Sequence, residues 1–214
     1  KIKKLIDIGC GVGHFLEAGN VNKISSLGLD ISEEIIKYLK QKKLKAEYYN
    51  LNETAKKRST DLLIVKNLLE HIENPSKIID KINKDFKYKY LLLSTPNDFS
   101  ELQKFAIKKH DIKKEYWIDE YHHLNYFNFK SMEQFLKKKN FKILGKFSSF
   151  PLEFISLLGL PYLKNRKKFG RQSHLLRVKI EKVISEFDQD FLIEFYEMLA
   201  KKNLGRELFF LVKK

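Results

Sequence analysis

Short hydrophobic runs alternate with amphipathic stretches along most of the chain. Strands separated by helical patterns are typical of a layered α/β domain with a mainly parallel sheet. We therefore expect an α/β fold with a seven-stranded sheet. The predicted strands are Lys4–Ile8, Ile24–Leu29, Lys45–Tyr49, Asp61–Lys66, Tyr88–Ser94, Phe141–Phe147 and Glu207–Val212.

The segment 151–203 departs from this alternation. It is too long for a turn between the last two strands, so we interpret it as a helical lid or substrate-binding insertion. Its apolar stripe favours core packing or a contact between two copies of the chain, a homodimer, over a membrane anchor. We expect a break near Asp188–Asp190. The stripe consists of Leu176, Ile180, Val183, Phe187, Phe191, Phe195 and Leu199.

The 214 residues fit a single domain, 1–214, and 43% hydrophobic with 32% charged residues is typical of a soluble globular protein. No run reaches the roughly 18 apolar residues of a membrane span. The one cysteine, Cys10, has no partner for an internal disulfide, and no leader opens the chain. These features predict a cytoplasmic protein.

The net charge of +15 raises the question of a nucleic-acid partner. Only five of the 42 basic residues are Arg, and the lysines are spread along the chain. A protein that reads nucleic acid more often concentrates Arg, whose guanidinium suits phosphates and base edges. We therefore favour a compositional origin of the charge, with nucleic-acid binding as the less favoured alternative.

Three glycines follow the first predicted strand, in "LIDIGCGVGHF". Gly9, Gly11 and Gly13 stand at every second position, which lets the backbone turn sharply and approach a ligand closely. The dinucleotide fingerprint has its second and third glycines three residues apart, so the spacing differs here. Since no Lys-Ser/Thr pair completes a P-loop, we expect a ligand without a phosphate that needs its own cradle.

Asp30, in "LGLDIS", ends the second predicted strand. A carboxylate there can accept hydrogen bonds from both hydroxyls of a ribose. The alternative is that Asp30 only caps the following helix. A ribose without a phosphate indicates an adenosyl ligand.

Four motifs together resemble the class I S-adenosylmethionine-dependent methyltransferases: "DIGCGVG", "LDIS", "DLLIVKNLLEHIENP" and "LLLSTPN". With "HHLNYFNFKSMEQFLKKKNFKI", the chain is most similar to the ubiquinone-biosynthesis O-methyltransferase type and related small-molecule methyltransferases. The resemblance covers the chain to about Phe147 and again "GRELFFLVKK". It implies a Rossmann-like doubly wound sheet, mostly parallel, with an antiparallel last strand.

The resemblance also implies S-adenosylmethionine as cofactor and S-adenosylhomocysteine as product. The glycine loop would pass under the methionine moiety, Asp30 would hold the ribose, and residues after the third and fourth strands would flank the adenine and the methionine. The family often has Asp where this chain has Asn50. The implied cofactor-binding residues are Asp7, Gly9, Cys10, Gly11, Gly13, Asp30, Ile31, Asn50, Leu51, Lys66 and Asn67.

Methyl transfer to an alcohol or phenol benefits from a base, and His is suited to that role near neutral pH. We expect His71, His122 and His123 near the carboxyl edge of the sheet, with His123 as the catalytic base and the other two in support. Structural or capping roles are the alternative for all three. Candidates for the substrate pocket are Glu70, Asn97, Trp117, Asp119 and Tyr121, the two aromatics alternatively packing a lid onto the core.

Several chemistries are not expected. Cys10 belongs to the glycine loop, so no cysteine is left to attack a pyrimidine ring, and "KNLLEH" lacks the Asn/Asp-Pro-Pro-aromatic box of amino-methylating nucleic-acid enzymes. We predict no metal site from the spacing of His, Cys and carboxylates, and the alternative is a site formed by Glu70, His71 and Glu73. The favoured function is O- or N-methylation of a small molecule such as a sugar, a quinone or another metabolite. The alternatives are an RNA or tRNA methyltransferase and a non-catalytic partner subunit, although the latter has no need of the intact glycines and Asp30.

Overall fold

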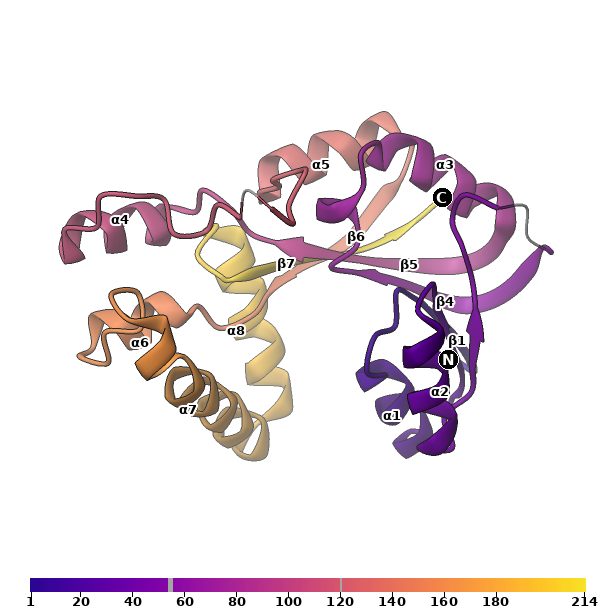
Figure 1. The fold of residues 1–214 in the computed structure, drawn as a ribbon, viewed down its shortest axis with the longest axis horizontal. Coiled ribbons are helices and arrows are strands. Elements are labelled where there is room, and N and C mark those ends of the chain that lie inside the picture. The colour runs from indigo at the N-terminus through magenta and orange to yellow at the C-terminus, as the bar shows by residue number, and fades with distance from the viewer. Residues whose placement is uncertain (54–55, 120) are drawn as a thin grey trace. The chain divides into compact units, whose positions relative to one another are not determined.

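The computed structural model describes residues 1–53, 56–119 and 121–214. Seven strands and the helices between them follow the alternating pattern of the sequence (Figure 1). The strands are β1 (Lys4–Ile8), β2 (Ser25–Asp30), β3 (Ala46–Tyr48), β4 (Arg58–Lys66), β5 (Phe86–Pro96), β6 (Lys142–Ser148) and β7 (Glu207–Lys213). The helices are α1 (His14–Val21), α2 (Glu33–Gln41), the 3-10 turn Leu69–His71, α3 (Pro75–Asp85), α4 (Glu101–His110), α5 (Phe129–Lys138), α6 (Leu152–Leu157), α7 (Arg166–Phe187) and α8 (Gln189–Lys201).

One seven-stranded sheet has the order β3-β2-β1-β4-β5-β7-β6. Strands β1 to β5 pair in parallel, with Asp7 opposite both Gly28 and Ile64. Strand β7 runs against its neighbours (Figure 1). The predicted α/β class, all seven strands and the antiparallel last strand are therefore confirmed.

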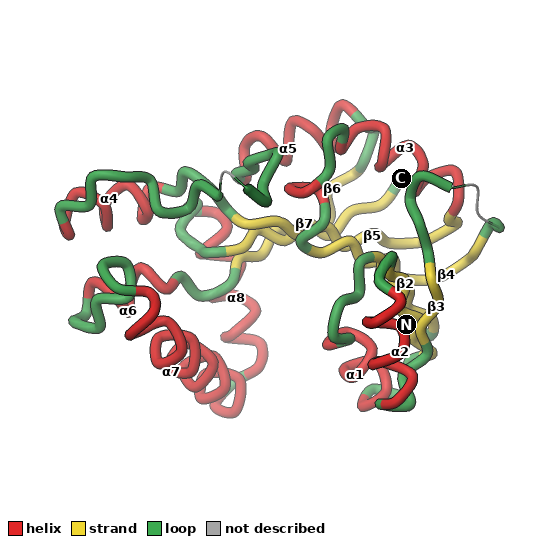
Figure 2. The backbone as a smooth tube through the Cα atoms, viewed as in Figure 1, coloured by secondary structure: helices red, strands yellow, loops and turns green. Residues whose placement is uncertain are grey.

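The chain divides into two compact units, which we describe separately. The first unit comprises Lys1–Thr95, Asn140–Leu144 and Phe210–Lys214, and the second comprises Pro96–Lys139 and Gly145–Phe209. The first unit holds β1 to β5 with α1 to α3, and Figure 2 shows its strands with helices and loops around them.

The core of the first unit lies along its central strands. Leu63, Ile64 and Val65 of β4 are consecutive and all at most 1% exposed, so both faces of this strand are covered. A parallel strand buried on both faces has a continuous apolar run instead of an alternating one. This explains why "DLLIV" reads as an unbroken hydrophobic stretch.

Side-chain caps fix where the helices begin. Asn74 caps α3 by accepting from the Lys77 backbone N–H, and Pro75 occupies the first helical position. Helix α4 begins with a capping box, in which Ser100 and Gln103 each accept from the other's backbone N–H at 3.2 and 2.8 Å. These polar residues direct the chain from each strand into the next helix.

The segment 151–203 folds into α6, α7 and α8 of the second unit. The predicted break is confirmed, because Asp188 has an extended backbone and caps α8. The apolar stripe does not form one buried face: Leu199 is 1% exposed, whereas Val183 and Phe187 are 63% and 83% exposed. Because the break reorients the helix axis, spacing counted across it does not describe a single face.

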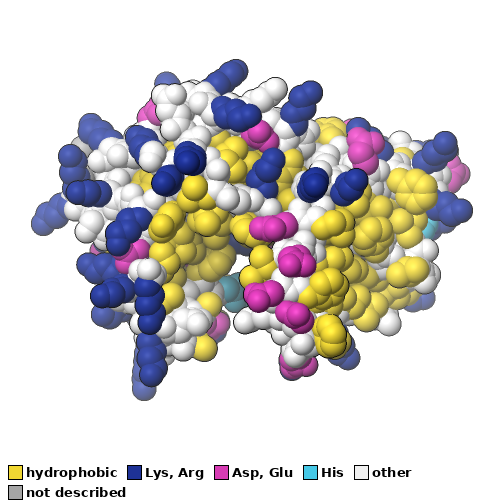
Figure 3. Space-filling view, turned by 180° about the vertical axis from the view of Figure 1, so that it is seen from behind, with side chains coloured by type: hydrophobic (Ala, Val, Ile, Leu, Met, Phe, Trp, Pro, Cys, Tyr) yellow, Lys and Arg dark blue, Asp and Glu magenta, His cyan; other side chains and the backbone are white. Residues whose placement is uncertain are grey.

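Among the described residues, no helix combines the length and the hydropathy that crossing a membrane requires. On the face that Figure 3 shows, Lys and Arg side chains are denser at the left of the view and at the top than at the lower right, where hydrophobic and acidic side chains predominate.

Candidate cofactor site

The glycine loop connects β1 to α1 and contains three glycines with positive φ. The φ values of Gly9, Gly11 and Gly13 are 71°, 48° and 86°, a region that side chains rarely adopt. The Gly9 N–H donates to the Leu29 carbonyl at 2.8 Å, which fixes the loop to the end of β2.

The glycines meet different surroundings. A Cβ on Gly11 would have no heavy atom within 4 Å, whereas one on Gly13 would lie 2.6 Å from Leu39 Cδ2 and 3.2 Å from Leu44 Cδ1. Gly13 is also the N-cap of α1. The structure therefore separates open space at Gly11 from tight packing at Gly13.

Asp30 connects the end of β2 to the glycine loop. Its Oδ2 accepts from the Gly11 N–H and its Oδ1 from the Ser32 N–H, both at 3.0 Å. Ser32, not Asp30, is the N-cap of α2, with its hydroxyl accepting from the Ile35 N–H at 3.3 Å. The alternative in which Asp30 serves only as that cap is therefore wrong.

A pocket of about 540 Å³ opens beside Asp30 and lies wholly within the first unit. Five of the predicted cofactor residues line it: Gly9, Asp30, Ile31, Asn50 and Leu51. The predicted catalytic residue His71 lines it too. Three strand ends and the segment after β4 thus contribute to one pocket.

Six of the predicted cofactor residues lie outside this lining. Cys10 is buried in a cluster with Leu16 and Leu39, and burial raises the pKa of its thiol. Lys66 ends β4 in register with Ser94. Asn67 has a φ of 49° and donates its N–H to the Ser94 carbonyl at 2.8 Å. The others are Asp7, Gly11 and Gly13.

Asp7, at the end of β1 before the glycine loop, has a carboxyl group with a strongly raised pKa. It is 3% exposed, and burial raises its pKa to about 7, with Lys66 acting in the opposite direction and Asp30 in the same direction. Its protonation therefore changes near neutral pH, beneath the glycine loop.

Sequence reasoning missed the part of the pocket that follows β4. The missed lining residues after β4 are Leu68, Ile72, Glu73, Asn74, Lys77 and Ile78. The signal was present in "LLEHIENP", which carried the resemblance but was assigned only to the acceptor side. Ile8, Leu29, Tyr49 and Asn52, at or just after the ends of β1 to β3, line the pocket too. The Tyr49 hydroxyl donates a hydrogen bond to Oδ2 of the buried Asp85 at 2.9 Å. The Lys81 ammonium forms an ion pair with the same oxygen at 2.5 Å.

The three candidate catalytic histidines belong to different units. In the first unit, His71 Nε2 lies 3.9 Å from Oε1 of the buried Glu70. In the second unit, the His122 ring contacts Asp119 at 2.9 Å, which lowers the pKa of Asp119, and the His122 side chain is 73% exposed. His123 is half-buried and packs edge-on against Tyr126, with ring centroids 6.0 Å apart.

The remaining substrate-pocket candidates lie in the second unit. Asn97 is fully buried and bonds to the backbone before β7, with Nδ2 donating to the Gly205 carbonyl at 2.8 Å. Trp117 is 9% exposed and packs edge-on against Phe99, but its Nε1–H has no partner among the described residues. Tyr121 is 90% exposed. The packing of Trp117 agrees with the lid-aromatic alternative, and the unpartnered N–H leaves a donor for a ligand.

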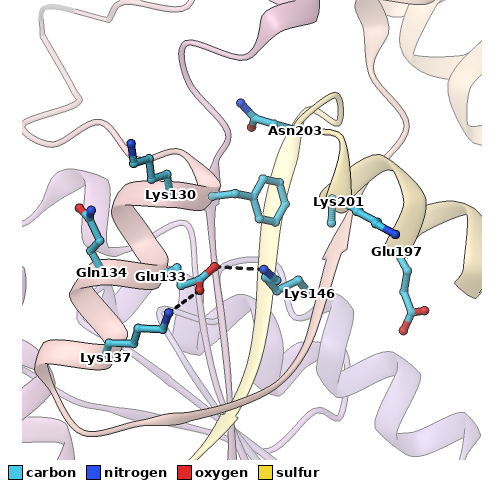
Figure 4. A pocket seen from close by; sticks show the side chains of 10 residues that line it. Lys130, Glu133, Gln134, Lys137, Lys146, Glu197, Lys201 and Asn203 are labelled. Carbon is cyan, nitrogen blue, oxygen red and sulfur yellow. Dashed lines mark hydrogen bonds and ion pairs between the residues drawn. The ribbon is translucent and has the colours of Figure 1, made fainter.

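A second pocket, of about 640 Å³, lies within the second unit and holds none of the predicted site residues. Four lysines line it, and Figure 4 shows Glu133 reaching toward both Lys137 and Lys146, at 2.7 and 3.0 Å. These pairs lower the pKa of Glu133. Part of the positive charge is thus neutralised within the pocket.

The family model described as "Methyltransferase domain" matches residues 1–145. A comparison with curated proteins gave no match. Similar solved structures cover the whole fold. An S-adenosylmethionine-dependent methyltransferase from Archaeoglobus fulgidus is 19% identical with a TM-score of 0.61, over 100% of this chain and 87% of that one.

Two further structures extend the comparison. An S-adenosylmethionine-dependent methyltransferase from Mesorhizobium loti is 14% identical with a TM-score of 0.57, over 99% of this chain and 90% of that one. The plantazolicin methyltransferase BpumL, in complex with SAH, is 19% identical with a TM-score of 0.54, over 100% of this chain and 77% of that one. At these identities the likeness establishes a shared fold.

Proposed function

The chain belongs to the methyltransferase domain family, and we propose that it transfers the methyl group of S-adenosylmethionine to an oxygen or nitrogen of a small-molecule acceptor. The observation that carries the proposal is the position of Asp30. This carboxylate lines the pocket and also holds the glycine loop through Gly11. A single side chain thereby joins the two features from which an adenosyl ligand was inferred.

The residues present fit this cofactor. A pocket of about 540 Å³ falls within the usual range of roughly 300 to 1,000 Å³ for small-molecule sites. Each oxygen of Asp30 accepts one backbone N–H, which leaves lone pairs for hydroxyl donors such as those of a ribose. Gly11 has open space where a side chain would project. Asn50, Leu51 and Ile31 would line the adenine side.

The bound cofactor supplies a methyl group already activated by a sulfonium, so the protein's main task is alignment of the acceptor. A base beside the acceptor hydroxyl or amine would take its proton. We propose His123 for this role, with His71 and His122 in support. Asn97 and Trp117 would line the acceptor side with Glu70, Asp119 and Tyr121.

Calorimetry with S-adenosylmethionine and S-adenosylhomocysteine tests the cofactor site. Losing charge-assisted hydrogen bonds should weaken binding in Asp30→Ala by about 1.5–3 kcal/mol, or roughly 10- to 150-fold. Glu34→Gln is the matched control, because Glu34 is an exposed carboxylate in the first turn of α2. Unchanged affinity in Asp30→Ala would contradict the assignment.

The acceptor class is tested with S-adenosylmethionine labelled in its methyl group and a cell extract separated into small molecules and RNA. We expect label in the small-molecule fraction. Label in RNA, with binding that falls steeply as salt rises, would instead identify an RNA or tRNA methyltransferase. Cofactor binding without transfer to any fraction would support the non-catalytic partner and refute the enzymatic role.

The base is tested once an acceptor is found. Removing a general base typically lowers kcat by about 10²- to 10⁴-fold, so we expect this loss in His123→Ala with cofactor affinity retained. His174→Ala is the control, because His174 is exposed on α7. If His123→Ala keeps full kcat and His71→Ala does not, the base is His71.

A further inference from the structure

Helix α7 exposes a basic surface with an apolar centre. Lys168, Arg171 and Lys179 surround Leu175 and Leu176, and together with Gln172 they line a groove of about 480 Å³. The two leucines are 50% and 41% exposed. The helix carries seven Lys or Arg and two Glu, a net charge of 7 − 2 = +5.

Helix α8 exposes a surface of the opposite sign. Asp190, Glu194 and Glu197 are exposed on it, next to Phe191 and Met198, which are 46% and 43% exposed. This helix has three acidic residues and one Lys, a net charge of 1 − 3 = −2. An acidic exposed helix is unexpected in a chain of net charge +15.

The three groove cations of α7 and the three acidic residues of α8 have no ion-pair partners within the described part of the chain. The two glutamates of α7 are the ones that pair, Glu181 with Arg177 at 2.7 Å and Glu186 with Lys182 at 3.5 Å. Two complementary charged surfaces therefore stand unpaired on adjoining helices.

We propose that a second copy of the chain binds to the basic surface of α7 and the acidic surface of α8. Helices α7 and α8 are consecutive and pack against each other. A two-fold axis would place α7 of each copy on α8 of the other, so that every cationic stripe meets an acidic one. The apolar centres would be buried in the same step, removing exposed Leu175, Leu176, Phe191 and Met198 from water.

The acidic stripe argues for a protein partner over a lipid surface. A basic amphipathic helix such as α7 can by itself lie on anionic lipid. The carboxylates of α8 would be repelled by the same lipid, and the apolar residues beside them would stay exposed. Figure 3 shows hydrophobic side chains gathered on a face of the molecule with a row of acidic side chains along them, a border that suits a basic partner surface.

Sedimentation equilibrium of the protein without cofactor tests this inference independently of the proposed function. We expect a reversible dimer whose dissociation constant rises with salt. Arg171→Glu and Glu194→Arg should each weaken the dimer about tenfold or more, since like charges would then face each other. An equimolar mixture of the two variants should recover both contacts in the mixed dimer, because Glu at position 171 then meets Arg at position 194 and the unmodified Arg171 meets the unmodified Glu194.

Lys130→Glu, which reverses a charge on α5, is the matched control and should leave the dimer unchanged. Leu175→Glu should abolish the dimer with an unchanged far-UV circular dichroism spectrum. A monomer at every concentration would overturn the inference. So would a monomer that sediments with phosphatidylserine vesicles, which would identify lipid as the occupant.

Discussion

Replacing Gly13 by alanine adds one methyl group at a position where two leucines already pack. The added Cβ would lie 2.6 Å from Leu39 Cδ2 and 3.2 Å from Leu44 Cδ1. Leu39 is fully buried and belongs to the cluster that also holds Leu16 and Ile36. These side chains cannot move aside without disturbing the core beneath α1 and α2.

Two effects contribute to the stability that Gly13→Ala should lose. Gly13 has a φ of 86°, and a side chain in left-handed backbone costs about 1–2 kcal/mol. Inserting a methyl group into a packed core costs about 1–3 kcal/mol more. We therefore expect Gly13→Ala to lower the free energy of unfolding by about 2–5 kcal/mol.

Gly11→Ala separates the two parts. Gly11 has a φ of 48° but open space at the Cβ position, so only the backbone part applies, about 1–2 kcal/mol. Because this methyl would project into space we assign to the cofactor, Gly11→Ala should instead weaken cofactor binding more than Gly13→Ala does.

Urea denaturation followed by far-UV circular dichroism measures both variants. Fluorescence is unsuitable, because the only Trp, Trp117, lies in the second unit. The reasoning would be refuted if Gly13→Ala were no less stable than Gly11→Ala. It would also be refuted if Gly11→Ala bound the cofactor as tightly as the unmodified protein.

Three further predictions concern stability. Because the pKa of Asp7 rises from 3.8 to about 7 on folding, the folded state binds more protons between these values, so stability should fall as pH rises from 4 to 7. In Asp7→Asn, this decrease in the free energy of unfolding should be smaller by an amount on the order of a few kcal/mol. Urea midpoints measured across this pH range test it, and a pH profile like that of the unmodified protein would contradict it. Tyr49→Phe should lose about 1–2 kcal/mol in the same assay, because Asp85 keeps Lys81 but loses its hydroxyl donor. Ser100→Ala should lose about 1 kcal/mol as the α4 cap is removed, and a loss near zero would show that solvent replaces the cap.

The strands were predictable because hydrophobic runs and burial have the same cause. All seven appear, with β1 as predicted and no strand end displaced by more than three residues. The largest displacement is at the start of β4, where Arg58, Ser59 and Thr60 pair with β5 despite their polarity. Backbone pairing with a neighbouring strand extends an element beyond its apolar run, and nothing in the local sequence records which neighbour is present.

The helical segment after β6 shows the converse failure. Counting apolar positions through Asp188 assumes a continuous helix, but the extended backbone at that residue starts a new axis. Residues that share a spacing then face different surroundings, as the buried Leu199 and the exposed Phe187 show. Side-chain periodicity predicts a face only within one unbroken helix.

The cofactor and acceptor sides differ in predictability for a physical reason. A backbone loop that must approach a ligand requires glycine, and a ribose requires an acceptor at one strand end, so Gly9 and Asp30 leave a readable pattern in the sequence. An acceptor pocket has no such shared requirement, since any shape and polarity that match one molecule will serve. Asn97 and Trp117 accordingly look like ordinary core residues, except that Asn97 Oδ1 and the Trp117 Nε1–H have no hydrogen-bond partner among the described residues. A buried donor without a partner carries a desolvation penalty of about 1–3 kcal/mol. A ligand acceptor atom at that nitrogen would remove the penalty, which makes Trp117→Phe the variant whose acceptor affinity, more than its stability, should fall.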